Sequence, residues 1–190
     1  MRSASFVVFC LWATSVSAAP EIIAGDLDRL ARYDEAAGRA ILDALARGDA
    51  EDVDALSAAL ADRPLAPEPA GDWRCRTIKA GGRTGLAVFA QFDCRITLIG
   101  PTEWRFEKLT GSERSLGTIA FHEGQAIYRG VGFSGDAPAL PYEAFDTDPN
   151  LTSDTIPQIA VFEQTGPDEA RLTFPYPNGD SAFDVLHLTR

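Results

Sequence analysis

Residues 71–79, with the sequence GDWRCRTIK, and residues 92–96, with the sequence FDCRI, decide the fold of this chain. Apolar and charged residues alternate in both stretches, which is the period-two pattern of strands with one buried face. Each stretch carries one cysteine, Cys75 or Cys94. We therefore expect an antiparallel hairpin stapled by a structural disulfide, since the sequence lacks the C-x-x-C spacing of a redox site.

The two cysteines also suggest a register for this hairpin. If they lie directly opposite each other, Trp73 faces Ile96 and Thr77 faces Phe92 on the same apolar surface as the sulfur atoms. One apolar and one charged surface is what a half-buried hairpin requires. A disulfide that closes a loop of this length stabilises a fold by about 3 kcal/mol in the chain-entropy model.

The period-two pattern continues to the end of the chain. Turn residues separate the runs, and short connections favour antiparallel hairpins. We expect eight strands, at residues 72–79, 86–98, 103–109, 116–121, 126–133, 158–164, 169–175 and 183–189. The predicted fold is mainly β (α+β), with residues 71–190 forming an antiparallel meander that closes into a small barrel; a sandwich is the alternative.

The segment before the strands has a helical pattern. Apolar residues recur at steps of three and four between residues 26 and 61, as on one face of a helix. We expect two helices here, in a helical hairpin over residues 19–62 that packs on the β domain; a partner-docking arm is the alternative. Prolines within residues 63–70 predict an extended linker between the two parts.

Residues 1–18 have the features of a secretory signal peptide. Arg2 supplies a positive charge, a short apolar stretch follows, and Val16-Ser17-Ala18 places small residues where a signal peptidase reads them. The apolar stretch is shorter than the roughly 20 residues that span a bilayer, so we expect cleavage and no membrane span in the mature chain. An N-terminal anchor helix is the alternative. An exported protein can form the disulfide, because the compartments outside the cytoplasm are oxidising.

The charge balance bears on partners. The chain of 190 residues has a formal net charge of −11 at pH 7. Nucleic acids and anionic membranes are bound through basic patches, so neither is an expected partner. A small molecule or another envelope protein fits this charge.

The first hairpin, together with residues 107–112 (EKLTGS), resembles an exported bacterial family known as domain of unknown function 4893. Residues 172–177 and 183–185 are similar to the closing segment of that family. The resemblance implies a location in the Gram-negative cell envelope, but no activity and no catalytic residues. Separately, Gly71 and Trp73 are similar to the lipocalin opening motif G-x-W, which implies a lipocalin-like barrel. A shared fold does not establish ligand binding.

Large aromatic residues are the candidate ligand-binding residues. They are expected to point into the barrel, where they could line an apolar cavity or simply fill the interior. They are Trp73, Phe92, Trp104, Phe106 and Phe174.

The charged surface of the first hairpin offers a candidate anion patch. Arg74, Arg76 and Arg95 share this surface in the expected register, with Arg74 opposite Arg95. Glu103 and Glu107 on the next strand could neutralise the patch, and a surface of ordinary ion pairs is the favoured interpretation.

Catalytic and metal-binding patterns are sparse. His122 and His187 are the two histidines, and neither stands in a recognisable hydrolase motif. Residues 146–157 begin like a calcium loop, but Leu151 replaces the required glycine and Pro157 stands in place of the bidentate glutamate. We expect no catalytic residue, no metal and no cofactor, with a hydrolase of unrecognised type as a weaker alternative.

Residues 134–156 form the longest expected connection. It contains apolar and aromatic residues that could plug the barrel mouth, cover an edge strand or contact a partner. The sequence favours a non-catalytic small-ligand-binding module of the cell envelope, and a protein-interaction or inhibitor module is the alternative.

Overall fold

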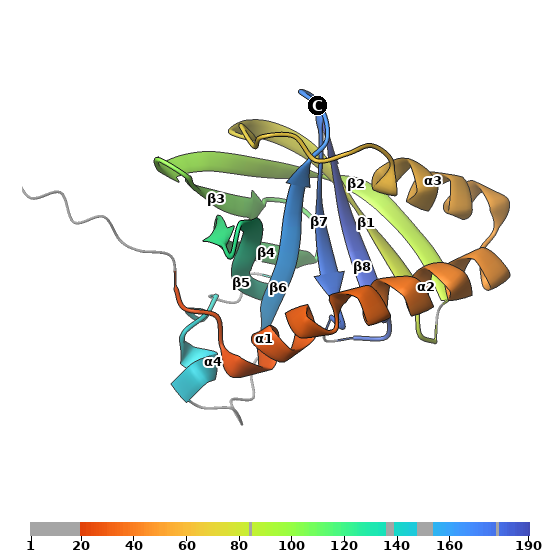
Figure 1. The fold of residues 1–190 in the computed structure, drawn as a ribbon, viewed down its shortest axis with the longest axis horizontal. Helices are drawn as coiled ribbons and strands as arrows, with labels where there is room; N and C mark the ends of the chain where they lie inside the picture. Colours follow the sequence, from red (N-terminus) through yellow and green to blue (C-terminus); the bar gives the residue numbers. More distant parts are fainter. Residues whose placement is uncertain (1–19, 84, 136–138, 148–153, 178) are drawn as a thin grey trace, which may run out of the picture.

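A computed structural model describes residues 20–83, 85–135, 139–147, 154–177 and 179–190 (Figure 1). Eight antiparallel strands form a closed barrel in chain order. They are β1 (Gly71–Gly81), β2 (Gly85–Gly100), β3 (Glu103–Lys108), β4 (Glu113–His122), β5 (Gln125–Ser134), β6 (Thr155–Gln164), β7 (Glu169–Pro175) and β8 (Phe183–Thr189). The last strand pairs with the first, from Arg74 opposite Thr189 to Ala80 opposite Phe183. The predicted fold class is confirmed, and the closed barrel excludes the sandwich.

The inward residues of the strands build one apolar core. Side chains alternate between the two faces of each strand, so every second residue faces the barrel axis. The buried inward residues are Trp73, Cys75, Cys94, Ile96, Trp104, Phe106, Ile119, Ala126, Tyr128, Ala160, Phe162, Ala170, Leu172, Phe174, Leu186 and Leu188. Three of the aromatic rings meet edge to face: Tyr128 contacts both Phe106 and Phe174, with ring centroids 5.6 and 6.0 Å apart.

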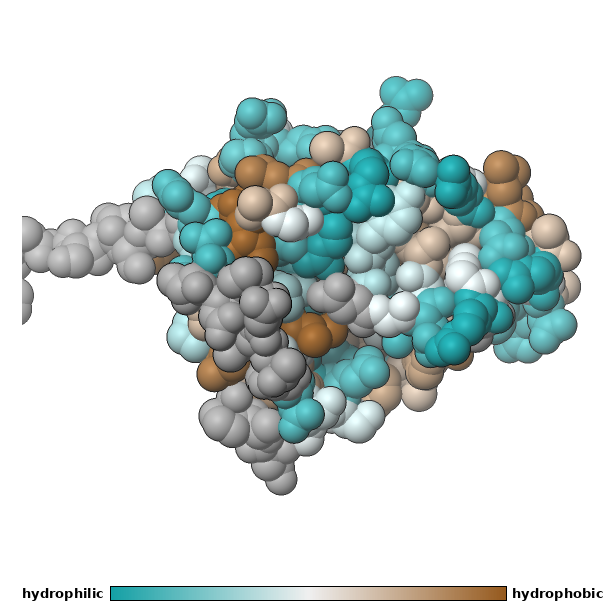
Figure 2. Space-filling view, turned by 90° about the horizontal axis from the view of Figure 1, so that it is seen from below, coloured by the Kyte–Doolittle hydropathy of each residue, from teal (hydrophilic) through white to brown (hydrophobic). Residues whose placement is uncertain are grey.

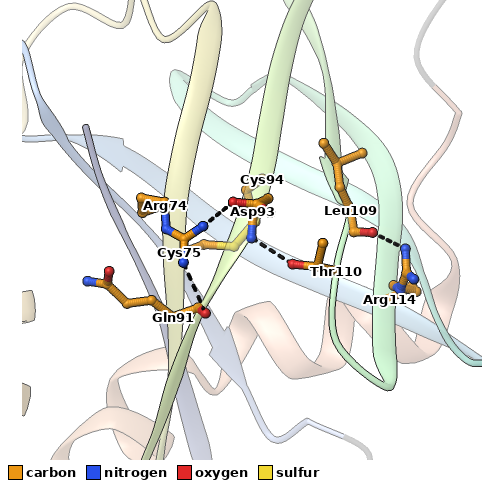
Figure 3. The surroundings of a disulfide bond; sticks show 8 residues. All are labelled: Arg74, Cys75, Gln91, Asp93, Cys94, Leu109, Thr110 and Arg114. Atoms are coloured by element: carbon orange, nitrogen blue, oxygen red, sulfur yellow. Dashed lines mark hydrogen bonds and ion pairs between the residues drawn. A yellow bond between two sulfur atoms is a disulfide. The ribbon is translucent and has the colours of Figure 1, made fainter.

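The predicted disulfide is confirmed, but the expected register is wrong by two residues. Cys75 and Cys94 are bonded with their Cα atoms 5.9 Å apart. Directly opposite Cys75 lies Phe92, and opposite Cys94 lies Trp73. The disulfide therefore runs diagonally between β1 and β2 (Figure 3). A shift of two residues keeps every side chain on its face, so the apolar pattern alone could not distinguish the two registers.

Three helices precede the barrel, where the sequence predicted two. They are α1 (Ala24–Ala31), α2 (Tyr33–Arg47) and α3 (Ala50–Leu60), and the break at Arg32 divides the first expected helix. The helices lie along the outside of the barrel (Figure 1). A second buried cluster joins α2 and α3 to the outer faces of β1, β2 and β8. The helical segment therefore packs on the barrel, as expected.

Small residues bring α2 close to the sheet. Ala36, Ala40 and Ala44 recur at steps of four, and all three are fully buried. A β carbon added to Gly81 of β1 would lie 3.0 Å from the Cα atom of Ala40, which shows how closely the helix approaches the strand. Short side chains on both elements allow this contact.

A predicted signal peptide precedes the helices, and a proline-rich segment follows them. The predicted signal peptide, residues 1–18, lies outside the described residues. The proline-rich residues 63–70 contain neither helix nor strand. Two of their backbone N–H groups donate to Gln164, at 2.8 Å from Leu65 to its carbonyl and 2.7 Å from Glu68 to its side chain. Within the described part of the chain, no helix has the length and apolar character that crossing a membrane requires.

Candidate functional site

One end of the barrel is open, and a pocket of about 260 Å³ lies there. Residues 85–88 and Gln91 of β2 pair with β1, whereas the pairing of β2 with β3 begins only at Cys94. The first hairpin therefore extends beyond its neighbour on one side and forms one wall. We call this hollow the mouth pocket. It is lined by Arg29, Thr77, Lys79, Lys108, Glu113, Arg114, Ser115, Gly132, Phe133, Ser134, Asp154, Ile156, Pro157, Gln158, Phe174, Pro177, Asp184 and Leu186.

Figure 2 views the molecule from below, from the side where α1, α2 and α4 (Ala144–Thr147) lie in Figure 1. Hydrophilic residues dominate this surface, and smaller hydrophobic patches lie between them. The mixture agrees with the lining of the mouth pocket, which combines charged side chains with apolar ones.

The pocket exists because the inner faces of β4 and β5 carry very small residues. Gly117 lies directly opposite Gly130, and Ser115 directly opposite Gly132. A β carbon at Gly117 would come within 2.5 Å of the Tyr128 ring, and one at Gly130 would come within 2.4 Å of its hydroxyl. The glycines thus leave room for the Tyr128 ring to lie across the barrel. Nearer the mouth, Ser115 and Gly132 border the pocket, and the absence of a side chain at Gly132 makes room for the Gln158 side chain.

Two lysines from different strands face the pocket. Lys108 of β3 is only 8 % exposed, and its ammonium group lies 4.5 Å from the centre of the Phe92 ring. Burial lowers the pKa of Lys108; the negative charge of Glu113 opposes this effect, and the positive charge of Lys79 adds to it. The ammonium of Lys79 lies 5.6 Å from the Phe89 ring centre. Aromatic faces attract both cations, yet a ring is a weaker partner than a carboxylate.

A buried carboxylate lies beside Lys79 on the neighbouring strand. Asp184 of β8 accepts a hydrogen bond of 2.6 Å from the hydroxyl of Ser181. Burial raises the pKa of Asp184 to about 6, against the smaller opposing effects of Ser181 and Lys79. The pocket therefore holds a group that can change its charge in mildly acidic solution.

The floor of the pocket is apolar with one amide. Phe174, Leu186 and Ile156 supply apolar surface. Gln158 also lines the pocket, and its side-chain oxygen accepts a hydrogen bond of 3.3 Å from the Tyr128 hydroxyl. Burial raises the pKa of Tyr128, so this hydroxyl stays protonated and serves as a donor.

The five aromatic residues proposed from the sequence lie in the barrel core, Phe92 being half-buried at its edge. Of these rings, Phe174 borders the mouth pocket. Trp73 is 3 % exposed, and its indole N–H donates to the Pro69 carbonyl at 2.8 Å. Trp104 and Phe106 are also buried. Their placement in the core gives these rings a packing role. Ligand binding by Trp73, Phe92, Trp104 and Phe106 stays a prediction.

The arginines of the candidate anion patch have acidic neighbours. Arg74 pairs with Asp93 beside the disulfide (Figure 3), and Arg95 donates to Asp72 at 2.6 Å. The two-residue change of register creates both pairs, and it removes the expected contact between Arg74 and Arg95. Arg76 faces outward opposite His187 of β8. The surface is thus one of ion pairs with these aspartates, and Glu107 of β3, directly opposite Arg95, adds a further negative charge beside that arginine.

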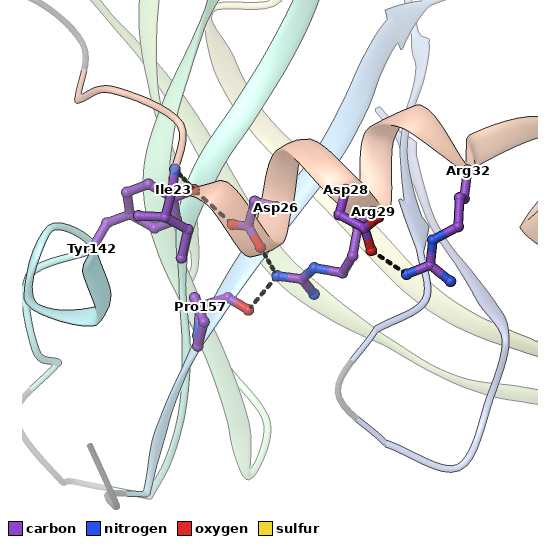
Figure 4. A network of polar contacts seen from close by, with 7 residues as sticks. All are labelled: Ile23, Asp26, Asp28, Arg29, Arg32, Tyr142 and Pro157. Carbon is purple, nitrogen blue, oxygen red and sulfur yellow. Dashed lines mark hydrogen bonds and ion pairs between the residues drawn. The ribbon is translucent and has the colours of Figure 1, made fainter. Parts of the chain in front are cut away.

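A polar network that the sequence did not reveal fixes the long connection to α1 (Figure 4). Asp26 is 1 % exposed and forms an ion pair with Arg29. Tyr142, from the long connection, donates its hydroxyl to Asp26 at 2.6 Å and accepts the Ile23 N–H at 3.3 Å. Arg29 also donates to the Pro157 carbonyl at 3.2 Å. Arg29 and Pro157 line the mouth pocket, so the network supports its rim.

The described middle of the long connection, residues 139–147, is not part of the mouth pocket lining. Leu140 and Tyr142 instead line a separate hollow against β4 and β5. This part therefore does not plug the mouth, and residues 136–138 and 148–153 lie outside the described residues. The same limit applies to the calcium-like stretch, since Asp148, Asn150 and Leu151 fall in the second gap.

The remaining candidates for chemistry lie outside the mouth pocket. His187 lies opposite Arg76 and Arg171 on its neighbouring strands, and burial lowers its pKa. His122 is the last residue of β4. Among the described residues, no group of three or more metal-binding side chains comes together.

The pocket lysines were missed although the sequence contained a signal for them. Lys79 has the same strand parity as the buried Cys75, and Lys108 has the same parity as Trp104 and Phe106. Alternation therefore predicts that both lysines point inward.

A family model with the description Domain of unknown function (DUF4893) matches residues 20–188. Comparison with curated proteins and with solved structures found no match. The matched range includes the helices and nearly the whole barrel with its mouth pocket.

Proposed function

We propose a function from the structure of the barrel itself. The chain belongs to the family described as Domain of unknown function (DUF4893), and this description assigns no activity. The protein is a non-catalytic binding module that holds one small molecule in the mouth pocket. The observation that carries this proposal is the contrast between the two parts of the barrel interior: one is filled by aromatic and aliphatic side chains, and the other is hollow.

The shape and lining of the hollow support binding. Its volume of about 260 Å³ is close to the lower end of the range for small-molecule sites, roughly 300–1,000 Å³. Such sites are concave and combine apolar surface with polar groups, and this pocket joins apolar surface to charged side chains. Barrels of eight strands have interiors that side chains can just fill or that can hold one small ligand.

The proposal includes a location outside the cytoplasm. The disulfide between Cys75 and Cys94 supports an oxidising compartment. The signal-like residues 1–18 and the family resemblance favour the periplasm of a Gram-negative cell or secretion from it. Fractionation of cells that express the full chain tests this part: a processed form in the periplasm or the medium is expected, and an unprocessed cytoplasmic form contradicts it.

Binding can be tested with N-phenyl-1-naphthylamine, a neutral probe whose fluorescence rises in apolar surroundings. We expect saturable binding at one site of the unaltered protein. The variant Ser115→Trp places a large ring in the hollow and should weaken probe binding at least tenfold. The matched control Thr97→Trp adds the same ring to an exposed position of β2 and should leave binding unchanged.

The outcomes separate the pocket from other apolar surfaces. Equal probe binding by the unaltered protein and by Ser115→Trp places the probe elsewhere and contradicts the proposal. A lack of saturable binding to the unaltered protein contradicts it as well. Circular dichroism of both tryptophan variants verifies that the barrel is intact.

A further inference from the structure

We infer that the molecule held by the mouth pocket is an organic anion, whose negative group lies between the ammonium groups of Lys79 and Lys108 and whose apolar part lies against Phe174 and Leu186. This inference rests on the proposed function and adds the chemical class of the ligand.

The first observation is the environment of Lys108. Its side chain is more than nine-tenths buried, and its ammonium group has the Phe92 ring as its neighbour. Among the described residues, the ammonium group of Lys108 makes neither a hydrogen bond nor an ion pair, although the negative charge of Glu113, which also lines the pocket, attracts it. A buried cation without a hydrogen-bonded anion costs free energy, so buried lysines are normally paired. In the described part of the chain Glu113 does not contact the ammonium directly, and a hydrogen-bonded negative group is what a ligand can supply.

The second observation is that a second lysine faces the same hollow. Lys79 lies on β1 and Lys108 on β3, and β2 runs between these two strands. The positive charge of Lys79 nevertheless acts on Lys108. Two like charges held in one hollow repel each other. A carboxylate or phosphate group between them would relieve this repulsion and gain two charge-assisted hydrogen bonds.

The remaining charges of the pocket set the position of the anion. Glu113 and Asp154 line the mouth together with Arg29 and Arg114, and Asp184 stands across from Lys79. The carboxylate of Asp184 repels a bound anion, so the negative group is expected nearer to Lys108. Asp184 also keeps the site from being uniformly positive, which disfavours multiply charged anions.

The apolar part of the ligand is inferred from the apolar side chains of β7 and β8 that border the pocket. Phe174 is 8 % exposed and Leu186 is 4 % exposed, and both border the hollow. An inorganic anion would leave these surfaces in contact with water. A ligand that joins a negative group to a hydrocarbon portion satisfies both walls.

Octanoate, 1-octanol and inorganic phosphate separate these contributions. Octanoate carries both features, 1-octanol lacks the charge, and phosphate lacks the hydrocarbon. Affinities are measured at pH 7.5 by isothermal titration calorimetry and by displacement of N-phenyl-1-naphthylamine. We expect octanoate to bind at least tenfold more tightly than either of the other two.

Charge variants assign the binding to the two lysines. Lys108→Met and Lys79→Met keep the length of the side chain and remove its charge. Each should weaken octanoate binding by about tenfold to a hundredfold, the usual range for a lost charged hydrogen bond, and should change 1-octanol binding less than threefold. Arg39→Met removes one positive charge from an exposed position of α2 and should leave both affinities unchanged.

Thermal unfolding distinguishes a ligand-binding role of Lys108 from a structural one. If the buried ammonium serves a ligand, Lys108→Met raises the melting temperature of the ligand-free protein while it weakens octanoate binding. A fall in melting temperature means that Lys108 stabilises the fold, and it overturns this assignment.

The inference and the proposed function can fail separately. Equal affinities for octanoate and 1-octanol, or octanoate binding that ignores both lysine variants, overturn the anion while the pocket stands. The anion is also overturned, and the pocket stands, if Ser115→Trp weakens binding of the probe but neither octanoate nor 1-octanol displaces the probe from the unaltered protein. Phosphate binding as tight as that of octanoate overturns the role of the apolar wall. If Ser115→Trp binds the probe as tightly as the unaltered protein does, the proposed binding function of the pocket is overturned as well.

Discussion

Lys79 of β1 and Asp184 of β8 lie directly opposite each other across the seam that closes the barrel, and both face its interior. The two side chains do not form an ion pair within the described structure. Asp184 instead accepts a hydrogen bond from Ser181, and its burial outweighs the attraction of Lys79. The carboxyl group therefore holds its proton more firmly than an aspartate in water does.

The pKa of Asp184 predicts a loss of stability with rising pH. It is about 6 in the folded protein, above its ordinary value of 3.8. Between these two pH values the unfolded chain has released the proton and the folded chain keeps it, so the free energy of unfolding falls as pH rises from about 4 to about 6. Asp184→Asn keeps an acceptor for Ser181 and removes the charge. It should raise the free energy of unfolding at pH 7 by about 2–3 kcal/mol.

Urea unfolding of the ligand-free protein at several pH values measures this effect. The difference between Asp184→Asn and the unaltered protein should be large at pH 7 and vanish near pH 4. The exposed Asp34→Asn serves as the control with the same change of side chain. A stability difference that does not vary with pH between 4 and 7 contradicts the assignment.

The disulfide between Cys75 and Cys94 should be a major source of stability. It joins residues separated by 19 positions, so the chain-entropy model assigns it about 3 kcal/mol. The double variant Cys75→Ala/Cys94→Ala should lose about this amount, measured as a lower urea midpoint at pH 7. Dithiothreitol should lower the midpoint of the unaltered protein by a similar amount and leave that of the double variant unchanged. Identical midpoints with and without reductant would refute a stabilising role.

Gly117 should not tolerate a methyl group. An added β carbon would lie 2.3 Å from the Arg129 carbonyl oxygen and 2.5 Å from the Tyr128 ring, so the backbone or the ring must move. Gly117→Ala should cost about 1–3 kcal/mol, the usual range for overpacking. Gly38→Ala is the matched control on α2, where an added β carbon meets no atom within 4 Å. It should stabilise the protein by about 1 kcal/mol through helix propensity.

Thermal and urea unfolding of these two alanine variants provide the test. Opposite shifts are expected from the same chemical change. If Gly117→Ala is as stable as the unaltered protein, the Tyr128 ring is not held against β4 as the structure shows.

The hydroxyl of Tyr142 should stabilise the attachment of the long connection to α1. Tyr142→Phe removes a hydrogen bond of 2.6 Å to the buried carboxylate of Asp26, and it leaves the Ile23 N–H without its acceptor. A hydrogen bond to a charged group contributes about 1.5–3 kcal/mol, so a loss of this size is expected. Hydrogen exchange of the Ile23 amide should become faster.

Tyr176→Phe is the control for this prediction. It keeps the ring that lies 4.5 Å from the Arg32 guanidinium, and the structure shows no hydrogen bond from its hydroxyl among the described residues. Its effect on stability should be small. Unchanged exchange of Ile23 in Tyr142→Phe would show that the network does not hold the connection in solution.

The strands could be predicted from the sequence because their signal is local. Period-two alternation and turn residues placed all eight, and the last two expected ranges coincide with β7 and β8. The disulfide could be predicted from the position of one cysteine in each strand of a hairpin. Its register could not, because moving one strand by two residues leaves every side chain on the same face.

The mouth pocket could not be predicted because it arises from what the strands lack. Gly117, Gly130 and Gly132 look like weak points in a strand pattern, but they make room for the side chains of Tyr128 and Gln158, which lie beneath the pocket. The large aromatic residues drew attention instead, and most of them fill the core. The network of Asp26 and Tyr142 joins residues 116 positions apart, a separation that no local pattern reveals.

The seam between β1 and β8 fixes when the barrel can close during synthesis. Its two strands are the first and the last of the barrel, with the six other strands between them in the sequence. Until β8 has left the ribosome, β1 and β7 each present an unpaired edge that can capture a strand from a neighbouring molecule. A nonsense mutation shortly before Phe183 would therefore leave an open sheet with two unpaired edges, which is prone to aggregate with other chains. Such a product would be more harmful to the cell than the simple loss of the protein.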